Sequence, residues 1–462
     1  MGLVSKYKRE NGLLSQSTIV DGMTNDNDPE SQWSNEEGNS QNTHRIVPSM
    51  ATNYSKMPWI FEYNLTSQDT TQFGQGAGVN GDLYFFLSET RSHLGKSDFM
   101  MCLTTNGIVR WKLPLESEPD MESIGISNVI SDRQGHLFYT ISWAGDTRIT
   151  AKICRVTNVQ TSHPLQKCVE NFQLFVYIKT LLALNEKYDL LITSVKGNET
   201  ELVPAVLNKT TLDLLWVNRH FFGAGIHGDY RWDLNMGNIF WIGGDDHLLK
   251  FDQKGEKLIN NVTQLDGFGR DFVLDRQQQI IVRPWQNMTS SPSKFLVSSH
   301  DVSTQQIKLR WNWPAPPAIA GNADITPPTI DENGTVYISS MPLVFAIDNR
   351  GKTLWTSELA TSSEMKKFEL AAFCITMNSK RRIVYILSGS SYSHKSDILY
   401  FITAVHMDLG KIIKRIDLNL GNDKGITPKC PILIGDEMFY FSWLTGQYPQ
   451  LVPFKVTGIS QL

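Results

Sequence analysis

The sequence predicts an all-β fold: an eight-bladed β-propeller of four-stranded antiparallel blades, with seven blades as the alternative. Two observations predict it. A meander pattern recurs at intervals of about 45 to 60 residues, and the two ends of the chain complement each other. Because a closed ring of repeats is one cooperative unit, we expect a single propeller domain over residues 57–462.

The stretch 331–355, DENGTVYISSMPLVFAIDNRGKTLW, shows the repeat most completely. A turn with Gly334 leads into an alternating strand, a second strand ends before Gly351, and a third ends on Trp355. Glycine and asparagine suit the positive φ of tight turns, and β-branched and aromatic residues suit the strands between them. The repeat therefore predicts strands joined by hairpins.

A large apolar residue marks the outermost strand of each repeat. We expect seven such strands, closing near Trp111, Val169, Trp216, Ile259, Trp311, Trp355 and Ile416. One such residue per blade is a packing period, so we expect the tryptophans to wedge between neighbouring blades rather than to hold a cofactor.

The ends of the chain supply the eighth blade. After residue 416 the sequence holds only three more strands, at 431–434, 438–444 and 451–456. The segment 58–65, PWIFEYNL, is the candidate for the missing fourth strand, and its pairing with the C-terminal blade closes the ring and removes two exposed edges. Residues 1–55 differ, since they are polar and poor in apolar residues, and we expect a disordered N-terminal segment there.

The repeat resembles that of the pyrroloquinoline-quinone-type propellers, the quinoprotein alcohol dehydrogenase-like superfamily. The best match is DNRGKTLW at 348–355, and GITP at 425–428 and DITP at 324–327 resemble the start of that family's innermost strand. In the family's enzymes the quinone lies at the ring axis on a tryptophan and on a disulfide between adjacent cysteines, next to Ca²⁺. No two cysteines are adjacent here, and no local motif matches the calcium ligands, so we expect a divergent, non-enzymatic member without a cofactor.

The net charge, the length of the apolar runs and the missing motifs argue against several classes of function. A net charge of −4 gives no reason to expect a nucleic-acid partner, and no apolar run is long enough for a transmembrane segment. Motifs for metal binding, phosphate binding and nucleophilic catalysis are missing, so we expect no metal and no catalytic residue. We expect a monomer that binds a protein or peptide partner on one face; the alternative is a small-ligand receptor or an oxidoreductase-like enzyme.

The loops from each outermost strand to the next innermost strand are the candidate binding region, because in a propeller they meet near the mouth of the central channel. We expect these loops at 72–78, 117–127, 221–231, 266–271, 321–326, 362–368 and 421–429. The candidate channel-mouth residues are His227, Asp229, Arg231, Arg270, Asp271, Asp324 and Lys429.

Cysteines and glycosylation sequons leave the compartment open. Cys154 and Cys168 flank a hairpin, and Cys374 and Cys430 lie in equivalent strands of adjacent blades, so both pairs are candidate disulfides, with Cys102 left over. The sequons with candidate glycosylation are Asn64, Asn198, Asn208, Asn261, Asn287 and Asn333, and a seventh lies at Asn53. Two interpretations remain: a cytosolic protein with buried thiols, or a secreted or lumenal protein whose N-terminus is absent from this sequence.

Overall fold

A computed structural model gives the arrangement of the strands. It describes residues 54–64, 71–78, 82–91, 95–104, 107–116, 122–127, 129–144, 149–169, 182–185, 188–196, 202–217, 229–232, 239–242, 248–256, 258, 268–274, 279–284, 295–304, 307–314, 316, 326–378, 382–390, 399–418, 432–434, 438–444 and 453–461. Residues 1–53 of the N-terminal segment expected to be disordered lie outside the described residues.

The described strands form eight antiparallel sheets, which we number in chain order. Sheet 1 contains β2 (Thr71–Ala77), β3 (Leu83–Arg91), β4 (Gly95–Leu103) and β5 (Val109–Pro114). Sheet 2 contains β6 (Glu122–Ile126), β7 (Ile130–Ser131), β8 (Leu137–Ala144), β9 (Ile149–Thr157) and β10 (Leu165–Val169). Sheet 3 contains β11 (Leu182–Asn185), β12 (Leu190–Lys196), β13 (Leu202–Asn208) and β14 (Leu214–Val217). Sheet 4 contains β15 (Asp229–Trp232), β16 (Ile239–Ile242) and β17 (Leu248–Phe251).

The second half of the chain continues the series. Sheet 5 contains β18 (Phe268–Leu274), β19 (Gln279–Pro284), β20 (Phe295–Asp301) and β21 (Lys308–Pro314). Sheet 6 contains β22 (Thr329–Ile330), β23 (Val336–Ser340), β24 (Leu343–Ile347) and β25 (Thr353–Glu358). Sheet 7 contains β26 (Leu370–Asn378), β27 (Ile383–Ser390), β28 (Tyr400–His406) and β29 (Ile412–Asp417). Sheet 8 contains β30 (Ile432–Ile434), β31 (Met438–Leu444), β32 (Pro453–Gln461) and β1 (Tyr54–Asn64).

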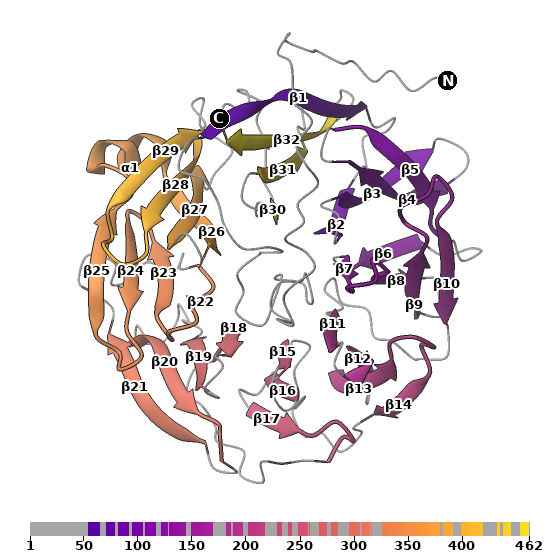
Figure 1. Cartoon of the computed structure of the whole chain (residues 1–462), viewed down its shortest axis with the longest axis horizontal. Coiled ribbons are helices and arrows are strands. Elements are labelled where there is room, and N and C mark those ends of the chain that lie inside the picture. Colours follow the sequence, from indigo (N-terminus) through magenta and orange to yellow (C-terminus); the bar gives the residue numbers. More distant parts are fainter. Residues whose placement is uncertain are drawn as a thin grey trace.

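The sheets stand around a common centre (Figure 1), and one inner strand of each sheet lies beside that of the next in the order β30, β2, β7, β11, β15, β18, β22 and β26. Sheet 8 confirms the predicted pairing of the two ends of the chain: β1 runs antiparallel to β32, with Tyr54 opposite Gln461 and Asn64 opposite Pro453. The number of blades stays a prediction, since sheet 4 has three described strands.

The hydrophobic core lies between neighbouring sheets. One cluster joins sheets 1 and 2 and includes Phe86, Trp143 and Val156; another joins sheets 6 and 7 and includes Ala346 and Ile386. In these two pairs each sheet is therefore stabilised by the face of its neighbour.

The predicted tryptophan wedges are confirmed at four of the outermost strands. The indole N–H of Trp111, Trp216, Trp311 and Trp355 donates to a backbone carbonyl in the next sheet, at Val159, Gln253, Asn349 and Met407 respectively, at 2.6 to 3.0 Å. At three of these contacts a glycine makes room: a Cβ on Gly255, Gly351 or Gly410 would lie 2.7 to 2.9 Å from the indole. All three glycines also have positive φ, so the turn that receives each indole needs glycine for two reasons.

One side of the ring carries the turns between the first and second strands and between the third and fourth strands of each sheet. We call it the turn face. Four of its turns share the sequence Asp-x-x-Gly, starting at Asp132, Asp252, Asp331 and Asp348. In each turn Oδ1 of the aspartate accepts a hydrogen bond from the backbone N–H of the residue four positions later, at 2.8 Å. The glycine of each turn has a φ of 80 to 83°. This bonding explains why the motif recurs.

Four of the expected loops contain innermost strands, so the loop prediction is wrong at those positions. Strands β2, β6, β15 and β18 occupy 72–77, 122–126, 229–231 and 268–271 of the expected loops. In β2 the physical reason is the close approach of neighbouring sheets: a Cβ on Gly76 would lie 2.3 Å from the carbonyl oxygen of Val129. Such a strand needs glycine, and glycine weakens the β signal in the sequence.

The expected loop 362–368 is helix α1 (Ser362–Phe368). Thr361 and Glu364 form a capping box at its start, and Glu369 ends it in the left-handed conformation. The Thr-x-x-Glu spacing is a helix-start signal that was visible in the sequence. Arg415 Nη1 lies 2.8 Å from Glu364 Oε1, which ties the helix to β29.

Candidate functional site

The structure brings four of the predicted channel-mouth positions onto two neighbouring innermost strands. Asp229 and Arg231 are alternate residues of β15, and Arg270 and Asp271 are consecutive residues of β18. Because β15 and β18 lie side by side, these positions share one sector of the inner ring. The other predicted residues, His227, Asp324 and Lys429, lie outside the described residues.

Two buried carboxylates on the turn face link neighbouring sheets. Asp132, in the turn between β7 and β8, has its Oδ2 3.0 Å from Nζ of Lys209 in sheet 3. Asp331, between β22 and β23, has its Oδ2 3.2 Å from Nη1 of Arg382 in sheet 7. Both carboxylates are fully buried, so a cation of the next sheet compensates each of them. These acidic groups serve the packing of the ring.

Two further charged pairs of the turn face lie within single sheets. Asp82 Oδ1 accepts from Nη2 of Arg110 at 3.0 Å; burial raises the pKa of Asp82, and the charge of Arg110 partly offsets that rise. Arg382 also pairs with Asp408, and hydrogen bonding to Arg382 lowers the pKa of Asp408. At normal pH Asp408 is therefore an ionised partner of Arg382.

Buried titratable groups also occur inside single sheets. His300 and Ser298 are alternate residues of β20, with Oγ of Ser298 3.0 Å from Nε2 of His300. Burial lowers the pKa of His300 to about 4, so the ring is neutral at normal pH. Burial likewise raises the pKa values of Tyr84, Tyr139 and Tyr337.

The described residues contain no group of three or more His, Cys, Asp and Glu side chains suited to a metal ion. None of their helices has the length and apolarity needed to cross a membrane.

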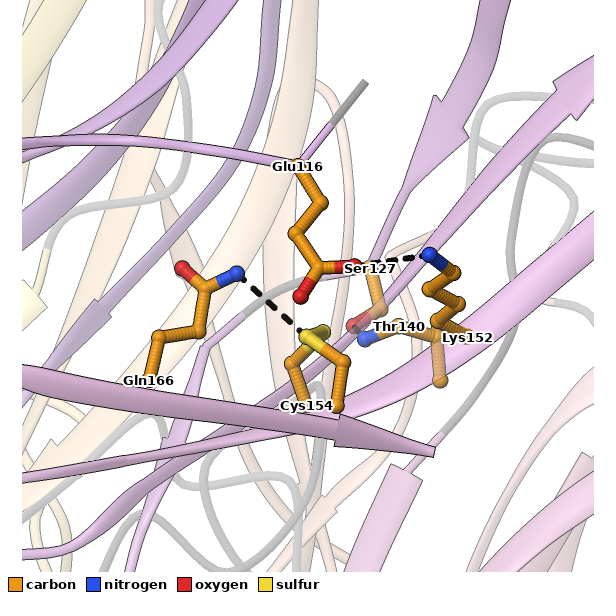
Figure 2. The surroundings of a disulfide bond; sticks show 7 residues. Glu116, Ser127, Thr140, Lys152, Cys154 and Gln166 are labelled. Atoms are coloured by element: carbon orange, nitrogen blue, oxygen red, sulfur yellow. Dashed lines mark hydrogen bonds and ion pairs between the residues drawn. A yellow bond between two sulfur atoms is a disulfide. The ribbon is translucent and has the colours of Figure 1, made fainter. Parts of the chain in front are cut away.

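A disulfide crosslinks the outer hairpin of sheet 2. Cys154 on β9 and Cys168 on β10 are directly opposite each other, and their sulfur atoms are 2.01 Å apart. Figure 2 shows Cys154 near Gln166, whose Nε2 donates to Sγ of Cys168 at 3.3 Å. On β9, two residues before Cys154, Nζ of Lys152 pairs with Oε2 of Glu116 at 2.7 Å. Cys374 is also in a disulfide, Cys102 is a buried free thiol, and Cys430 lies outside the described residues.

The structure describes the side chains of two of the sequon asparagines, Asn333 and Asn208. Asn333 is exposed in the turn before β23, and Asn208 is half-buried at the end of β13. The Asn208 side chain is engaged, because Nδ2 donates to Asp189 and Oδ1 accepts from the backbone N–H of Thr211. Asn64 is the last residue of β1, while Asn53, Asn198, Asn261 and Asn287 lie outside the described residues.

A surface feature that sequence reasoning missed is apolar exposure on the outermost strands. Aliphatic side chains are exposed at or just before the start of these strands, which is their turn-face end: Ile108, Leu165, Leu214, Leu215, Leu309, Leu354, Leu409 and Ile412. The signal was present in the sequence as leucines next to the wedge tryptophans, but only the ring shows which side of each strand is open.

Two of these residues flank one contact between sheets, and a third, Ile412, follows two residues after it. Trp355 packs on Gly410, and Leu354 and Leu409 are the chain neighbours of these two residues. Leu354, Leu409 and Ile412 are 53%, 68% and 38% exposed, and we call these three residues the apolar patch. Exposed apolar side chains are typical of the centre of a binding site.

Comparisons with known proteins identify the architecture. The sequence matches no family model and no curated protein. Among solved structures, the C-terminal WD40 domain of Sif2 is 8% identical, with a TM-score of 0.50 over 90% of this chain and 99% of that chain. A europium-containing methanol dehydrogenase is 10% identical, with a TM-score of 0.50 over 96% of this chain and 99% of that chain.

A third similar structure, the Dos1 propeller, is 14% identical, with a TM-score of 0.49 over 90% of this chain and 95% of that chain. The two structures with a TM-score of 0.50 share the fold of this chain, and identities this low show no shared activity. The ring of antiparallel sheets and these similarities together identify the chain as a divergent β-propeller.

Proposed function

We propose that this chain is a non-catalytic β-propeller scaffold that binds a protein or peptide partner on its turn face. The observation that carries the proposal is the apolar patch of Leu354, Leu409 and Ile412. Burying exposed aliphatic side chains against a partner gains roughly 25 cal/mol per Å² of apolar surface, which makes such a patch a natural docking point.

The surroundings of the apolar patch indicate the chemistry of the partner. Lys352, Lys411 and Lys414 are exposed next to it. The outermost strands with described side chains carry seven basic residues: Arg110, Lys112, Lys167, Lys308, Arg310, Lys414 and Arg415. The same strands carry two acidic residues, Glu358 and Asp417, although the whole chain has a net charge of −4. An acidic peptide with apolar anchors complements this combination.

The placement of the ionisable groups supports a non-catalytic role. Asp132, Asp331 and Lys209 are buried in contacts between sheets. A catalytic group has to reach a substrate, and these side chains are already committed to turns and inter-sheet pairs.

The proposal is tested by selecting peptides from a randomised displayed library on the immobilised full chain. We expect enriched peptides that combine acidic and apolar residues. Their Kd, measured by fluorescence anisotropy, should rise at least tenfold when Leu354→Asp and Leu409→Asp are combined. Leu165→Asp is the matched control, since Leu165 is 60% exposed on β10 of sheet 2, away from the apolar patch. Peptides that bind the double variant as well as the parent protein would exclude this site.

A polar small-ligand site at the inner ring is the second candidate. It is favoured by the four charged positions on β15 and β18, with Arg231 and Arg270 as the candidate anchors for an anionic group. Native mass spectrometry of the full chain tests it: a retained small molecule should be present on the parent protein and absent from Arg231→Ala. The parent protein is also incubated with a mixture of anionic metabolites before the measurement. If its spectrum then contains no retained ligand, this alternative is wrong.

A further inference from the structure

The exposed sequon at Asn333 and the disulfides point to one covalent modification. Cys154 and Cys168 are bonded to each other, and Cys374 is also disulfide-bonded. Disulfides persist in oxidising compartments such as the secretory pathway. Asparagine-linked glycosylation takes place in the same pathway, so sequons of such a chain meet the glycosylation machinery.

Asn333 has the geometry of a site that tolerates a glycan. Its backbone N–H donates to Oδ1 of Asp331 at 2.9 Å, and the next residue, Gly334, has a φ of 80°. The turn is thus held by the main chain and by Asp331, while the Asn333 side chain is exposed. A sugar on Nδ2 of Asn333 leaves every one of these bonds intact.

Asn208 provides an internal contrast. Its Nδ2 donates to Oδ2 of Asp189 at 2.9 Å, and its Oδ1 accepts from Thr211 at 2.8 Å. The hydroxyl of Thr210, the third residue of this sequon, also donates to Asp189 at 2.9 Å. Both polar side chains of the sequon therefore hold the turn, and Lys209 between them is buried. A glycan at Asn208 would compete with these contacts.

We propose that Asn333 carries an N-linked glycan in the native protein and that Asn208 does not. In the transfer, Nδ2 of Asn333 bonds to the anomeric carbon of a lipid-linked oligosaccharide diphosphate. The amide loses one proton, the bond from sugar to phosphate breaks, and the lipid diphosphate leaves. The inference is independent of the proposed partner, because occupancy of Asn333 is measured without any binding assay.

The test is peptide mapping of the full chain isolated from the cells that naturally produce it. Peptide N-glycosidase in ¹⁸O-labelled water converts a glycosylated asparagine into labelled aspartate. We expect the label at Asn333, none at Asn208, and a Cys154–Cys168 crosslinked peptide in the non-reduced digest. An unlabelled Asn333 overturns the proposal, and a labelled Asn208 overturns the selection between the two turns.

Two matched variants separate modification from folding. In a eukaryotic secretory host, Asn333→Gln should increase the electrophoretic mobility of the chain. Its Tm should equal that of the parent protein after enzymatic removal of the glycan. Asn208→Gln should leave the mobility unchanged and lower the Tm, because it misplaces the amide that bonds to Asp189 and Thr211. The opposite result for the two variants contradicts the assignment.

Discussion

At the scale of the residue, position in the ring decides what a side chain does. The tryptophans of the outermost strands are large and aromatic, as in a ligand platform, yet each indole is inserted against the next sheet. Trp355 shows both parts of this role. Its ring lies against Gly410, and its N–H satisfies the carbonyl of Met407 at 2.6 Å.

Trp355→Ala should destabilise the protein by about 3 kcal/mol, because it leaves a cavity between sheets 6 and 7 and an unpaired carbonyl. Trp355→Phe keeps most of the packing and should cost about 1 kcal/mol for the lost hydrogen bond. Urea unfolding followed by circular dichroism measures both values. The control is Leu354→Ala at the exposed neighbouring position; equal losses at 354 and 355 would contradict the wedge role.

His300 makes stability depend on pH. Burial lowers its pKa from 6.5 to about 4, so between these values the unfolded chain binds a proton that the folded protein does not. The free energy of unfolding should therefore fall as the pH drops from 6.5 toward 4, by roughly 3 kcal/mol, and the contribution is fully present above 6.5.

Urea unfolding at pH 4.5 and pH 7 of the parent protein and of His300→Asn measures this contribution. The difference between the two pH values should shrink in His300→Asn and stay unchanged in His163→Asn, where the histidine is exposed. A parent-like pH dependence in His300→Asn would assign the effect to other groups.

At the scale of the element, the Asp-x-x-Gly turn serves two purposes. In the outer turn, Asp348 bonds to the backbone of Arg350 and Lys352. In the inner turn, Asp132 makes the same kind of backbone bond and also pairs with Lys209 of the next sheet. The inner turn therefore joins sheets as well as strands.

A double-mutant cycle on Asp132 and Lys209 separates these purposes. Lys209→Met should destabilise by about 3 kcal/mol or more, because Asp132 stays buried without its cation. Asp132→Asn keeps a turn acceptor, and combining it with Lys209→Met should cost less than the sum of the single changes. Asp348→Asn is the control for the turn alone. Additive losses in the cycle would show that the ion pair does not couple the sheets.

At the scale of the whole molecule, the ends of the chain complete one sheet. Strand β1 is the outer edge of sheet 8 and pairs along its length with β32. The closure joins residues about 400 positions apart. It costs a large loss of chain entropy, which the cooperativity of a closed ring offsets.

Deleting residues 54–64 should lower the Tm and cause concentration-dependent aggregation, because the edge of β32 becomes open to other chains. Deleting residues 1–45 is the control and should leave the Tm unchanged, as expected for a polar segment outside the propeller. Differential scanning calorimetry and light scattering measure the two effects. A deletion of 54–64 that melts like the full chain would show that closure adds no stability.

Much of the fold was predictable from the sequence because its signals are local and repeated. The alternation of β-branched and aromatic residues marks strands, Asp-x-x-Gly marks turns, and the terminal tryptophans mark the outermost strands. The innermost strands were missed where the approach of neighbouring sheets requires glycine, as at Gly76. Helix α1 was missed because one capping signal was outweighed by the surrounding β pattern.

The candidate site was less predictable, because a site is a spatial relation between blades. The sequence named charged residues such as Asp229 and Arg270, and the structure supplied the adjacency of β15 and β18. The sequence alone could not distinguish Asn333 from Asn208, since both were expected in turns and both begin an Asn-x-Thr sequon. By itself the sequence determined the repeat, the all-β class and the partner of the C-terminal strands, which follow from local patterns. Tertiary structure decided which polar groups are committed between sheets and which apolar ones stay open, because burial depends on the neighbouring blade.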